Sequence, residues 1–399
     1  MKRLSSMVLV FIFLTIVPFT AAADCPTLVK QALAATESLC KETENNQACY
    51  GNIKLQAKPA FQAENFVFSK PGDHANIADI QSLQLSPMTL DTGEWGVALM
   101  HVQANLPTAS PNNLLLLAFG DVFLENTAPD STVLDGEVGN NFANARWLPN
   151  TSARTLISLS PGQPVTVVDR LADNSWLRIN LPDNGETGWV KSELLNVKGD
   201  LNTLNVANAT QPHYRPMQAF TFKSGTSGQG CSEIPQDGLL IQTPEGAGEV
   251  QLWINQVVVK LGSTVYFQAQ PDGDMTVTTL EGHATVEALG VSYTAVAGSS
   301  VHVKLDEDMN PVSAPSLPEA YKMDDVQYLP IENLQRQISI HAPLTEQEII
   351  DIDKAQSNRN NLNCPGNSCH NGTNNNNGNG GNGGNGGNSD NKDKGKGKP

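Results

Sequence analysis

The stretch GETGWVKSELL, residues 185–195, has the pattern of the closing strand of a small β-barrel. It follows the strand candidate SWLRINL, in which alternate residues lie on opposite faces: Leu177, Ile179 and Leu181 on one, Trp176, Arg178 and Asn180 on the other. The Asn-Gly pair at residues 184–185 is a strong hairpin signal. Upstream, PGQPVTVVDR opens with a Pro-Gly turn and continues as a Val-rich strand. This density of short strands and tight turns predicts a small barrel, which we bound at residues 136–198.

The same segment resembles a known family. ANARWLPN, LSPGQPVTVVDR, NSWLRINL and GETGWVKSELL follow one another in the order and at the spacing of the bacterial Src-homology-3-type (SH3b) domain. The positions that match are Asn144, Arg146, Pro149, Gly162, Trp176, Gly188 and Trp189. Trp147 departs from the pattern, because the family usually has a small polar residue after the arginine.

The resemblance implies a module that binds cell-wall peptide or another extracellular polymer. The candidate ligand-binding residues are Arg146, Trp147, Trp176, Arg178 and Trp189. Aromatic faces bind such ligands. A structural role for Trp176 and Trp189 is the competing interpretation, and in so small a barrel it is the favoured one.

The N-terminus has the features of a secretory signal peptide over residues 1–23. Lys2 and Arg3 precede an apolar run from Met7 to Phe19 and then three alanines. That run of about 13 residues is shorter than the roughly 20 that span a bilayer. No later stretch is long and apolar enough to span, so the sequence predicts no integral membrane segment after signal cleavage. The expected location is secreted or extracytoplasmic, at the cell envelope.

The charge of the mature chain excludes one class of partner. Removal of residues 1–23 would take away Lys2 and Arg3 and no acidic residue, which lowers the net charge from -16 to -18. Nucleic acids and anionic membrane surfaces are bound through basic patches. We therefore expect no nucleic-acid partner.

An even number of cysteines in an exported chain predicts disulfides. The six are Cys25, Cys40, Cys49, Cys231, Cys364 and Cys369. Residues 26–39 are predicted to form a helix with Leu28, Ala32, Ala35 and Leu39 on one face. Such a helix would hold Cys25 and Cys40 about 22 Å apart, too far for a bridge. Cys40 with Cys49 and Cys364 with Cys369 are plausible pairs, which would leave Cys25 for Cys231.

Metal and cofactor binding are not expected. The cysteine spacings give no C-x-x-C pair of a zinc site, and CPGNSCH is not a haem-attachment motif. The sequence also lacks the serine-hydrolase, zinc-protease, P-loop and dinucleotide fingerprints.

The predicted fold class is mostly β and multidomain, with the barrel between two other β domains. Residues 24–135 are assigned to a first β-rich domain with the N-terminal helix docked on it; its strand candidates are KLQAKPAF, NFVFS, GVALMHVQANL and NLLLLAFGDVFL. Residues 199–315 are assigned to a second. There, eight candidates follow one another at sandwich-like spacing: GLLIQT, EVQLWI, QVVVKL, TVYFQAQ, MTVTTL, HATVEAL, VSYTAV and SVHVKL.

The second β region, at about 239–305, is similar to the β-repeat of the FecR-type sensor domain, on the residues GSTVYFQA, LEGHATVEA and VAGSSVHV. A connector at 316–363 follows, with a short helix near 346–356 signalled by Thr345 and Glu348 as a capping box. Residues 364–399 are Asn/Gly-rich, lack core-forming residues and predict a disordered tail.

A cysteine peptidase is the sharpest enzymatic alternative, because Cys231 follows the barrel and His283 comes about fifty residues later. In such a peptidase the nucleophile opens a helix, and Pro235 and Gly238 interrupt any helix after Cys231. A disulfide is the favoured role for Cys231, and a surface or hydrogen-bonded role is favoured for His283 and His302.

The function predicted from the sequence is therefore non-catalytic binding at the envelope, with peptidoglycan or an extracellular protein or glycan as partner. The alternative is a FecR-like envelope sensor or signalling component. Such sensors are normally tethered by a transmembrane helix, which the predicted mature chain lacks. The cysteine peptidase is the third interpretation.

Overall fold

The structure of the protein is a computed structural model that describes residues 24–61, 63–104, 113–128, 132–181, 186–210, 212–225 and 233–362, with side chains as far as residue 356. The predicted signal peptide, the Asn-Gly turn at 184–185, the Asn/Gly-rich tail and Cys231, Cys364 and Cys369 lie outside the described residues. Residues up to Gln356 form one compact unit, and Ser357 begins a second.

Most of the described chain forms a β-sandwich. Its first sheet has the spatial order β25 (Glu319–Ala320), β24 (Ser299–Lys304), β21 (Asp274–Glu281), β20 (Thr264–Ala269), β17 (Gly238–Gln242), β6 (Leu114–Phe119), β5 (Val97–Val102), β1 (Gln47–Asn52), β3 (His74–Asn76). The second sheet has the order β2 (Leu55–Pro59), β4 (Ile80–Leu85), β7 (Val122–Asn126), β16 (Ala219–Ser224), β18 (Val250–Ile254), β19 (Val257–Leu261), β22 (His283–Ala288), β23 (Val291–Val296). The prediction of a mostly β fold is confirmed.

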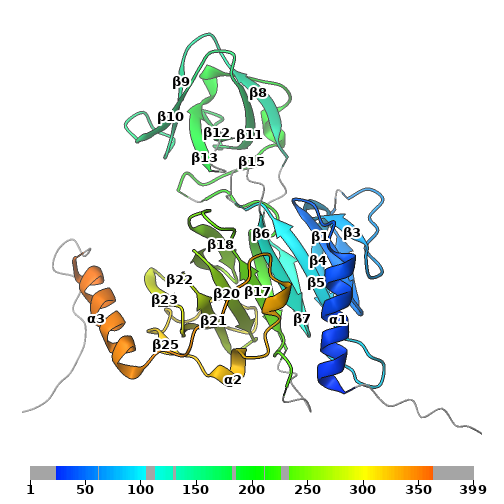
Figure 1. Cartoon of the computed structure of the whole chain (residues 1–399). Helices are drawn as coiled ribbons and strands as arrows, with labels where there is room; N and C mark the ends of the chain where they lie inside the picture. Colours follow the sequence, from blue (N-terminus) through cyan, green and yellow to red (C-terminus); the bar gives the residue numbers. More distant parts are fainter. Residues whose placement is uncertain are drawn as a thin grey trace, which may run out of the picture. The chain divides into compact units, whose positions relative to one another are not determined.

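The two β regions that flank the barrel in sequence share both sheets. β6 pairs with β17, with Leu117 opposite Leu240, and β7 pairs with β16. Cyan β6 and green β17 lie side by side in Figure 1. The division into separate β domains at 24–135 and 199–315 is therefore wrong for these strands, because each region supplies part of each sheet and part of one common core.

A continuous apolar run explains how β6 joins two cores. Leu114, Leu116 and Ala118 face the core between the sheets, whereas Leu115, Leu117 and Phe119 face a second cluster on the other side of the first sheet. A strand with both faces covered is apolar throughout rather than alternating. The run NLLLLAF therefore marks the centre of the sandwich.

The N-terminal helix and the connector cover that outer face of the first sheet. Helix α1 (Cys25–Leu39) begins at the cap Asp24, whose carboxylate accepts a hydrogen bond from the Thr27 N–H at 3.0 Å. Its buried residues are Leu28, Val29, Ala32 and Thr36. The predicted face was wrong in part, because Leu39 is 40% exposed and Thr36 is buried against β1, where Gly51 leaves room for it.

The connector contributes Tyr321, Val326, Leu329 and Leu334 to the same cluster. It contains helix α2 (Met323–Val326) and the 3-10 turn Ile331–Asn333. Another short 3-10 turn, Ile77–Asp79, precedes β4. Helix α3 (Glu346–Leu362) begins as the capping box predicts, with the Thr345 N–H donating to the Glu348 carboxylate at 2.8 Å.

Cys40 and Cys49 form a disulfide with a Cα separation of 5.6 Å, as predicted. Cys25 is also disulfide-bonded. Its pairing with Cys231 stays a prediction, since Cys231 lies outside the described residues.

All eight strand candidates after residue 237 are confirmed as β17 to β24. In the first β region NFVFS forms no strand, and Phe66 and Phe68 instead pack against the core from an irregular segment. The FecR-type resemblance stays a prediction. None of the helices in the described ranges combines the length and the hydropathy that a membrane span requires.

The predicted barrel is present, and its strands lie in the order β10 (Thr155–Leu159), β9 (Ala143–Arg146), β13 (Thr187–Lys191), β12 (Trp176–Asn180), β11 (Pro164–Arg170), β8 (Leu134–Val138), β14 (Leu195–Val197). The 3-10 turns Ser192–Leu194 and Leu201–Thr203 accompany β14, and β15 (Asn205–Val206) pairs in parallel with β11. Leu177, Ile179 and Leu181 point into the barrel core, as their alternation predicts.

Candidate functional site

Four polar and aromatic residues form one row across the outer face of the barrel. Arg146 pairs with Trp189, Trp189 with Arg178, and Arg178 with Asp169, on strands β9, β13, β12 and β11. Directly opposed residues on neighbouring strands share a face of the sheet. The row therefore brings together three of the five predicted binding residues, on the side away from the barrel core.

Arg178 is the centre of this row and is 3% exposed. Its guanidinium lies 4.4 Å from the Trp189 ring centroid and donates to the Asp169 carboxylate at 3.0 Å. Burial lowers the pKa of the Arg178 guanidinium, and the negative charge of Asp169 opposes that shift.

A segment that follows the barrel covers the row. This cover, residues 205–210 and 212–215, begins with β15 on β11 and places the Asn208 carbonyl 3.2 Å from the Arg178 guanidinium. His213 Nδ1 lies 2.9 Å from the Asp169 carboxylate, and both side chains are almost fully buried. The outer face at Arg178 and Trp189 is consequently part of a packed interface. No local pattern in the cover indicates which strand it contacts, so sequence analysis could not predict this burial.

Burial removes three of the predicted binding residues from the accessible surface. Trp176, Arg178 and Trp189 are 8%, 3% and 2% exposed. The structural role favoured for Trp176 and Trp189 agrees with this burial. A ligand could reach the Arg178 guanidinium only if the cover moved.

Trp147 is different, because 61% of it is exposed. It begins a tight loop that ends at Arg154, and its backbone N–H donates to the Arg154 carbonyl at 3.0 Å. Arg146 holds the loop closed from within, donating to the Ala153 carbonyl at 2.8 Å and to the Thr155 hydroxyl at 3.1 Å. The loop therefore presents an indole on a backbone that is already ordered, which lowers the entropy lost on binding.

Sequence reasoning missed a second exposed aromatic residue on the barrel. Phe142 directly precedes β9 and is 69% exposed. A signal was available, because Phe142 stands in the polar stretch GNNFAN, where no core strand is expected. Phe142 and Trp147 flank the two ends of β9 (Ala143–Arg146).

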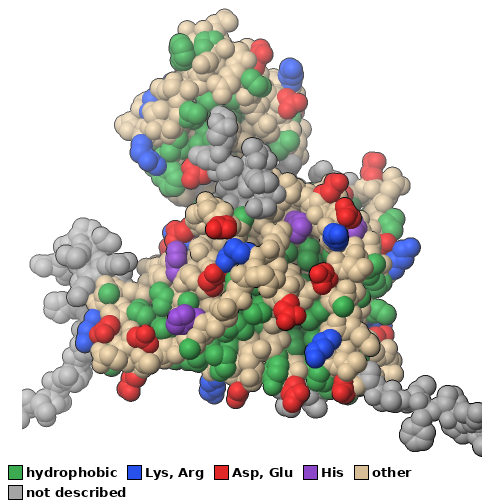
Figure 2. Space-filling model, viewed as in Figure 1, with side chains coloured by type: hydrophobic (Ala, Val, Ile, Leu, Met, Phe, Trp, Pro, Cys, Tyr) green, Lys and Arg blue, Asp and Glu red, His purple; other side chains and the backbone are tan. Residues whose placement is uncertain are grey.

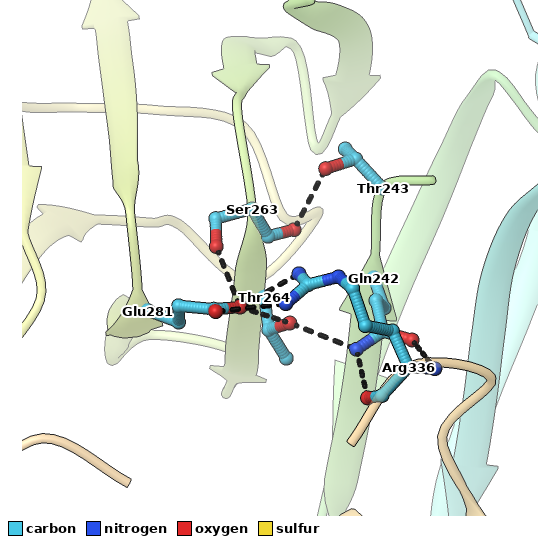
Figure 3. A network of polar contacts seen from close by, with 6 residues as sticks. All are labelled: Gln242, Thr243, Ser263, Thr264, Glu281 and Arg336. Carbon is cyan, nitrogen blue, oxygen red and sulfur yellow. Dashed lines mark hydrogen bonds and ion pairs between the residues drawn. The ribbon is translucent and has the colours of Figure 1, made fainter. Parts of the chain in front are cut away.

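The sandwich carries a separate polar network beside a hollow of about 490 Å³. The Arg336 guanidinium, from the connector, makes two contacts with the Glu281 carboxylate of β21, at 2.7 and 2.6 Å (Figure 3). The backbone of Arg336 exchanges two hydrogen bonds with the Gln242 side chain, at 2.9 and 2.8 Å. These contacts attach the connector to β17 and β21.

His283 and Glu249 lie on the rim of the same hollow, with His283 Nε2 2.9 Å from the Glu249 carboxylate. The imidazole packs over Gly262, where an added Cβ would come within 2.6 Å of the ring. His302 contacts Glu319 at 3.0 Å and the Thr276 hydroxyl at 3.1 Å. These contacts agree with the hydrogen-bonded roles favoured from the sequence. The peptidase interpretation stays a prediction, since Cys231 is not among the described residues.

The charges on the visible face of the molecule fit the acidic composition. Figure 2 shows Lys and Arg side chains scattered singly among Asp and Glu side chains on this face. Among the residues that the structure describes, no group of three or more His, Cys, Asp or Glu side chains is arranged to hold a metal ion.

Comparison with known proteins identifies one part of the chain. Residues 142–196 match the family model described as bacterial SH3 domain, which confirms the resemblance inferred for the barrel. No curated protein matches the chain.

Proposed function

We propose that this chain is an exported, non-catalytic binding protein of the cell envelope, whose barrel holds a cell-wall peptide or another extracellular polymer. The observation that carries the proposal is the match of residues 142–196 to the bacterial SH3 domain, in a barrel that presents Trp147 on an ordered loop. A bacterial SH3 domain suggests a module that binds the cell wall. The proposal assigns the contact to Trp147 and Phe142, in place of the buried Trp176, Arg178 and Trp189.

The chemistry of this surface favours a ligand with apolar or sugar faces and carboxylates. The segment from Phe142 to Val168 contains Arg146 and Arg154 and no acidic residue, although the whole chain has a net charge of -16. Arg154 is exposed beside the Trp147 loop. An indole stacks on apolar or sugar surfaces, and a guanidinium pairs with carboxylates. Peptidoglycan offers both kinds of group.

Export is supported by the pattern of residues 1–23 and by the disulfides. The Cys40–Cys49 bridge and the bonded state of Cys25 fit an oxidising compartment outside the cytoplasm.

The test is co-sedimentation of the mature chain, residues 24–399, with purified peptidoglycan. We expect Trp147→Ala to lower the affinity for peptidoglycan about tenfold, seen as a smaller bound fraction. Phe142→Ala should lower the affinity less. Phe61→Ala is the matched control, because Phe61 is an exposed aromatic residue of the sandwich (99% exposed). Binding that is unchanged in the Trp147→Ala, Phe142→Ala double variant would refute this site.

The absence of catalysis is tested in the same experiment. Soluble fragments released from peptidoglycan are measured in the same tubes. Release by the wild-type chain that disappears in Cys231→Ala would establish the peptidase alternative instead.

A further inference from the structure

Among the described strands of the sandwich, one long edge strand carries no charged residue and no proline. The first sheet ends in β25 and β3, which have two and three residues. One edge of the second sheet is β2, which carries Lys58 and ends at Pro59. The other edge is β23, six residues with the sequence VSYTAV. An edge strand without charge or proline is a template for pairing with another strand.

The hydrogen-bonding groups at the outer edge of β23 are identified by their contacts. The Thr294 N–H donates to the Gln356 side-chain oxygen at 3.1 Å, and the Gln356 side-chain nitrogen donates to the Thr294 carbonyl at 2.7 Å. The hydroxyls of Thr294 and Thr285 approach to 2.9 Å across β22 and β23, which fits a non-hydrogen-bonded pair. Thr294 therefore directs its backbone groups away from β22, and the two-residue period does the same for Ser292 and Val296. The Gln356 amide occupies the place of a peptide group in a neighbouring strand.

The helix that supplies Gln356 has little buried surface. Four half-buried residues lie along one face of α3, Ile349, Ile352, Asp353 and Gln356, and none of its side chains from Glu346 to Gln356 is fully buried. Elements with little buried apolar surface open at low free energy. α3 is thus a cover that can leave β23 while the sandwich stays folded.

We propose that β23 is the pairing edge for a second copy of this chain, and that α3 covers this edge in the monomer. Antiparallel pairing about a two-fold axis at Thr294 places Thr294 opposite its own counterpart, Ser292 opposite Val296, and Tyr293 opposite Ala295. No charged residue is brought together, and a large side chain faces a small one. A contact of this symmetry closes on itself and gives a dimer rather than a chain of copies. This self-complementarity favours a second copy over an unrelated extended peptide.

The test is sedimentation velocity of the full mature chain over a concentration series up to about 100 µM, because dimerisation follows mass action. Two variants remove the cover: Gln356→Ala deletes the amide, and Ile352→Pro breaks α3. Both are expected to strengthen dimerisation at least about tenfold over wild type. Gln347→Ala is the matched control, since Gln347 is exposed on α3 and contacts Asp351 of the same helix.

Edge-blocking variants then locate the contact. Thr294→Lys, added to either cover variant, would place two like charges opposite each other at the axis and should restore the monomer. Ser292→Lys is the second blocking variant. The proposal is overturned if the Ile352→Pro chain stays monomeric, or if its dimer persists in both blocking variants.

Discussion

The barrel has two tryptophan–arginine pairs that differ in access. Trp189 with Arg178 lies in a packed row on the outer face, whereas Trp147 beside Arg146 stands exposed at a loop. The difference comes from residues outside the family match, since the cover closes over Asp169 and Arg178 and leaves the Trp147 loop free. A binding surface on such a module therefore depends on the chain around it as well as on the module itself.

Among the charged side chains, the largest effect on stability is expected at Arg178. Arg178→Ala leaves the buried Asp169 carboxylate without its arginine, and removal of one partner of a buried pair destabilises by about 3 kcal/mol or more. Urea unfolding followed by tryptophan fluorescence measures this, because three of the five tryptophans, Trp147, Trp176 and Trp189, are in the barrel.

Arg154→Ala is the matched control for that experiment, as Arg154 is an exposed arginine of the same barrel. A surface substitution of this kind changes stability by about 0.5 kcal/mol or less. Equal effects of the two substitutions would contradict the packed role of Arg178. A combined alanine substitution of Trp147 and Arg178 would mix binding with unfolding, so it cannot test the ligand site.

A smaller effect on stability is expected at His213, the cover residue that contacts the Asp169 carboxylate of the barrel. His213→Ala removes the contact to the Asp169 carboxylate, and loss of a hydrogen bond to a charged group costs about 1.5–3 kcal/mol. Hydrogen exchange should rise at Asn205 and Val206, whose strand β15 depends on the cover staying in place. Exchange that stays as slow as in wild type would show that the cover is held by other contacts.

The success of the sequence predictions in each region depends on how far apart in the sequence its paired strands are. The barrel strands β11, β12 and β13 pair with sequence neighbours, so turn signals and alternation were sufficient. The sandwich pairs β6 with β17 across the whole barrel, more than a hundred residues apart. Local patterns predicted many of the strands there but missed β1, β4 and β16. They also carry no information on which distant strand is the partner.

The site was predicted in part for the same reason. The alternation in SWLRINL correctly placed Leu177 inside and Arg178 outside the barrel core. The burial of Arg178 involves the cover, whose Asn208 carbonyl accepts a hydrogen bond from it, a long-range contact without a local signature. Trp147 was identified as a departure from the family pattern, and Phe142 was missed although its polar surroundings GNNFAN offered a signal.

A still smaller effect on stability is expected at Trp147, in contrast to Trp189. Trp147→Ala should change the free energy of unfolding by about 0.5 kcal/mol or less, whereas Trp189→Ala should cost about 3–5 kcal/mol because it empties a buried site. Thermal melts of the two variants compare them directly. A strongly destabilised Trp147→Ala would mean that the indole packs in solution, and the difference between the two surfaces would disappear.

A comparably small effect is expected at another arginine, Arg336, whose ion pair with Glu281 lies in the sandwich. The Arg336–Glu281 pair is 29% and 38% exposed, so solvent screens it far more than the buried Arg178–Asp169 pair. Arg336→Gln should cost about 0.2–1 kcal/mol at neutral pH. The connector keeps its anchor in this variant, because the two hydrogen bonds to Gln242 come from the Arg336 backbone.

The pH dependence of that small effect has a definite sign. The hydrogen bond from Arg336 holds the pKa of the Glu281 carboxyl below its ordinary value of 4.5. A depressed carboxyl pKa contributes stability above the unfolded-state value, and this contribution is lost as the pH falls through the folded-state value. The difference in free energy of unfolding between wild type and Arg336→Gln, measured in urea titrations, should therefore be constant at neutral pH and shrink below about pH 4.5. Lys304→Gln, which breaks the more exposed pair with Asp274, is the control. A difference that grows on acidification would mean that Arg336 stabilises the sandwich through contacts other than the Glu281 carboxylate.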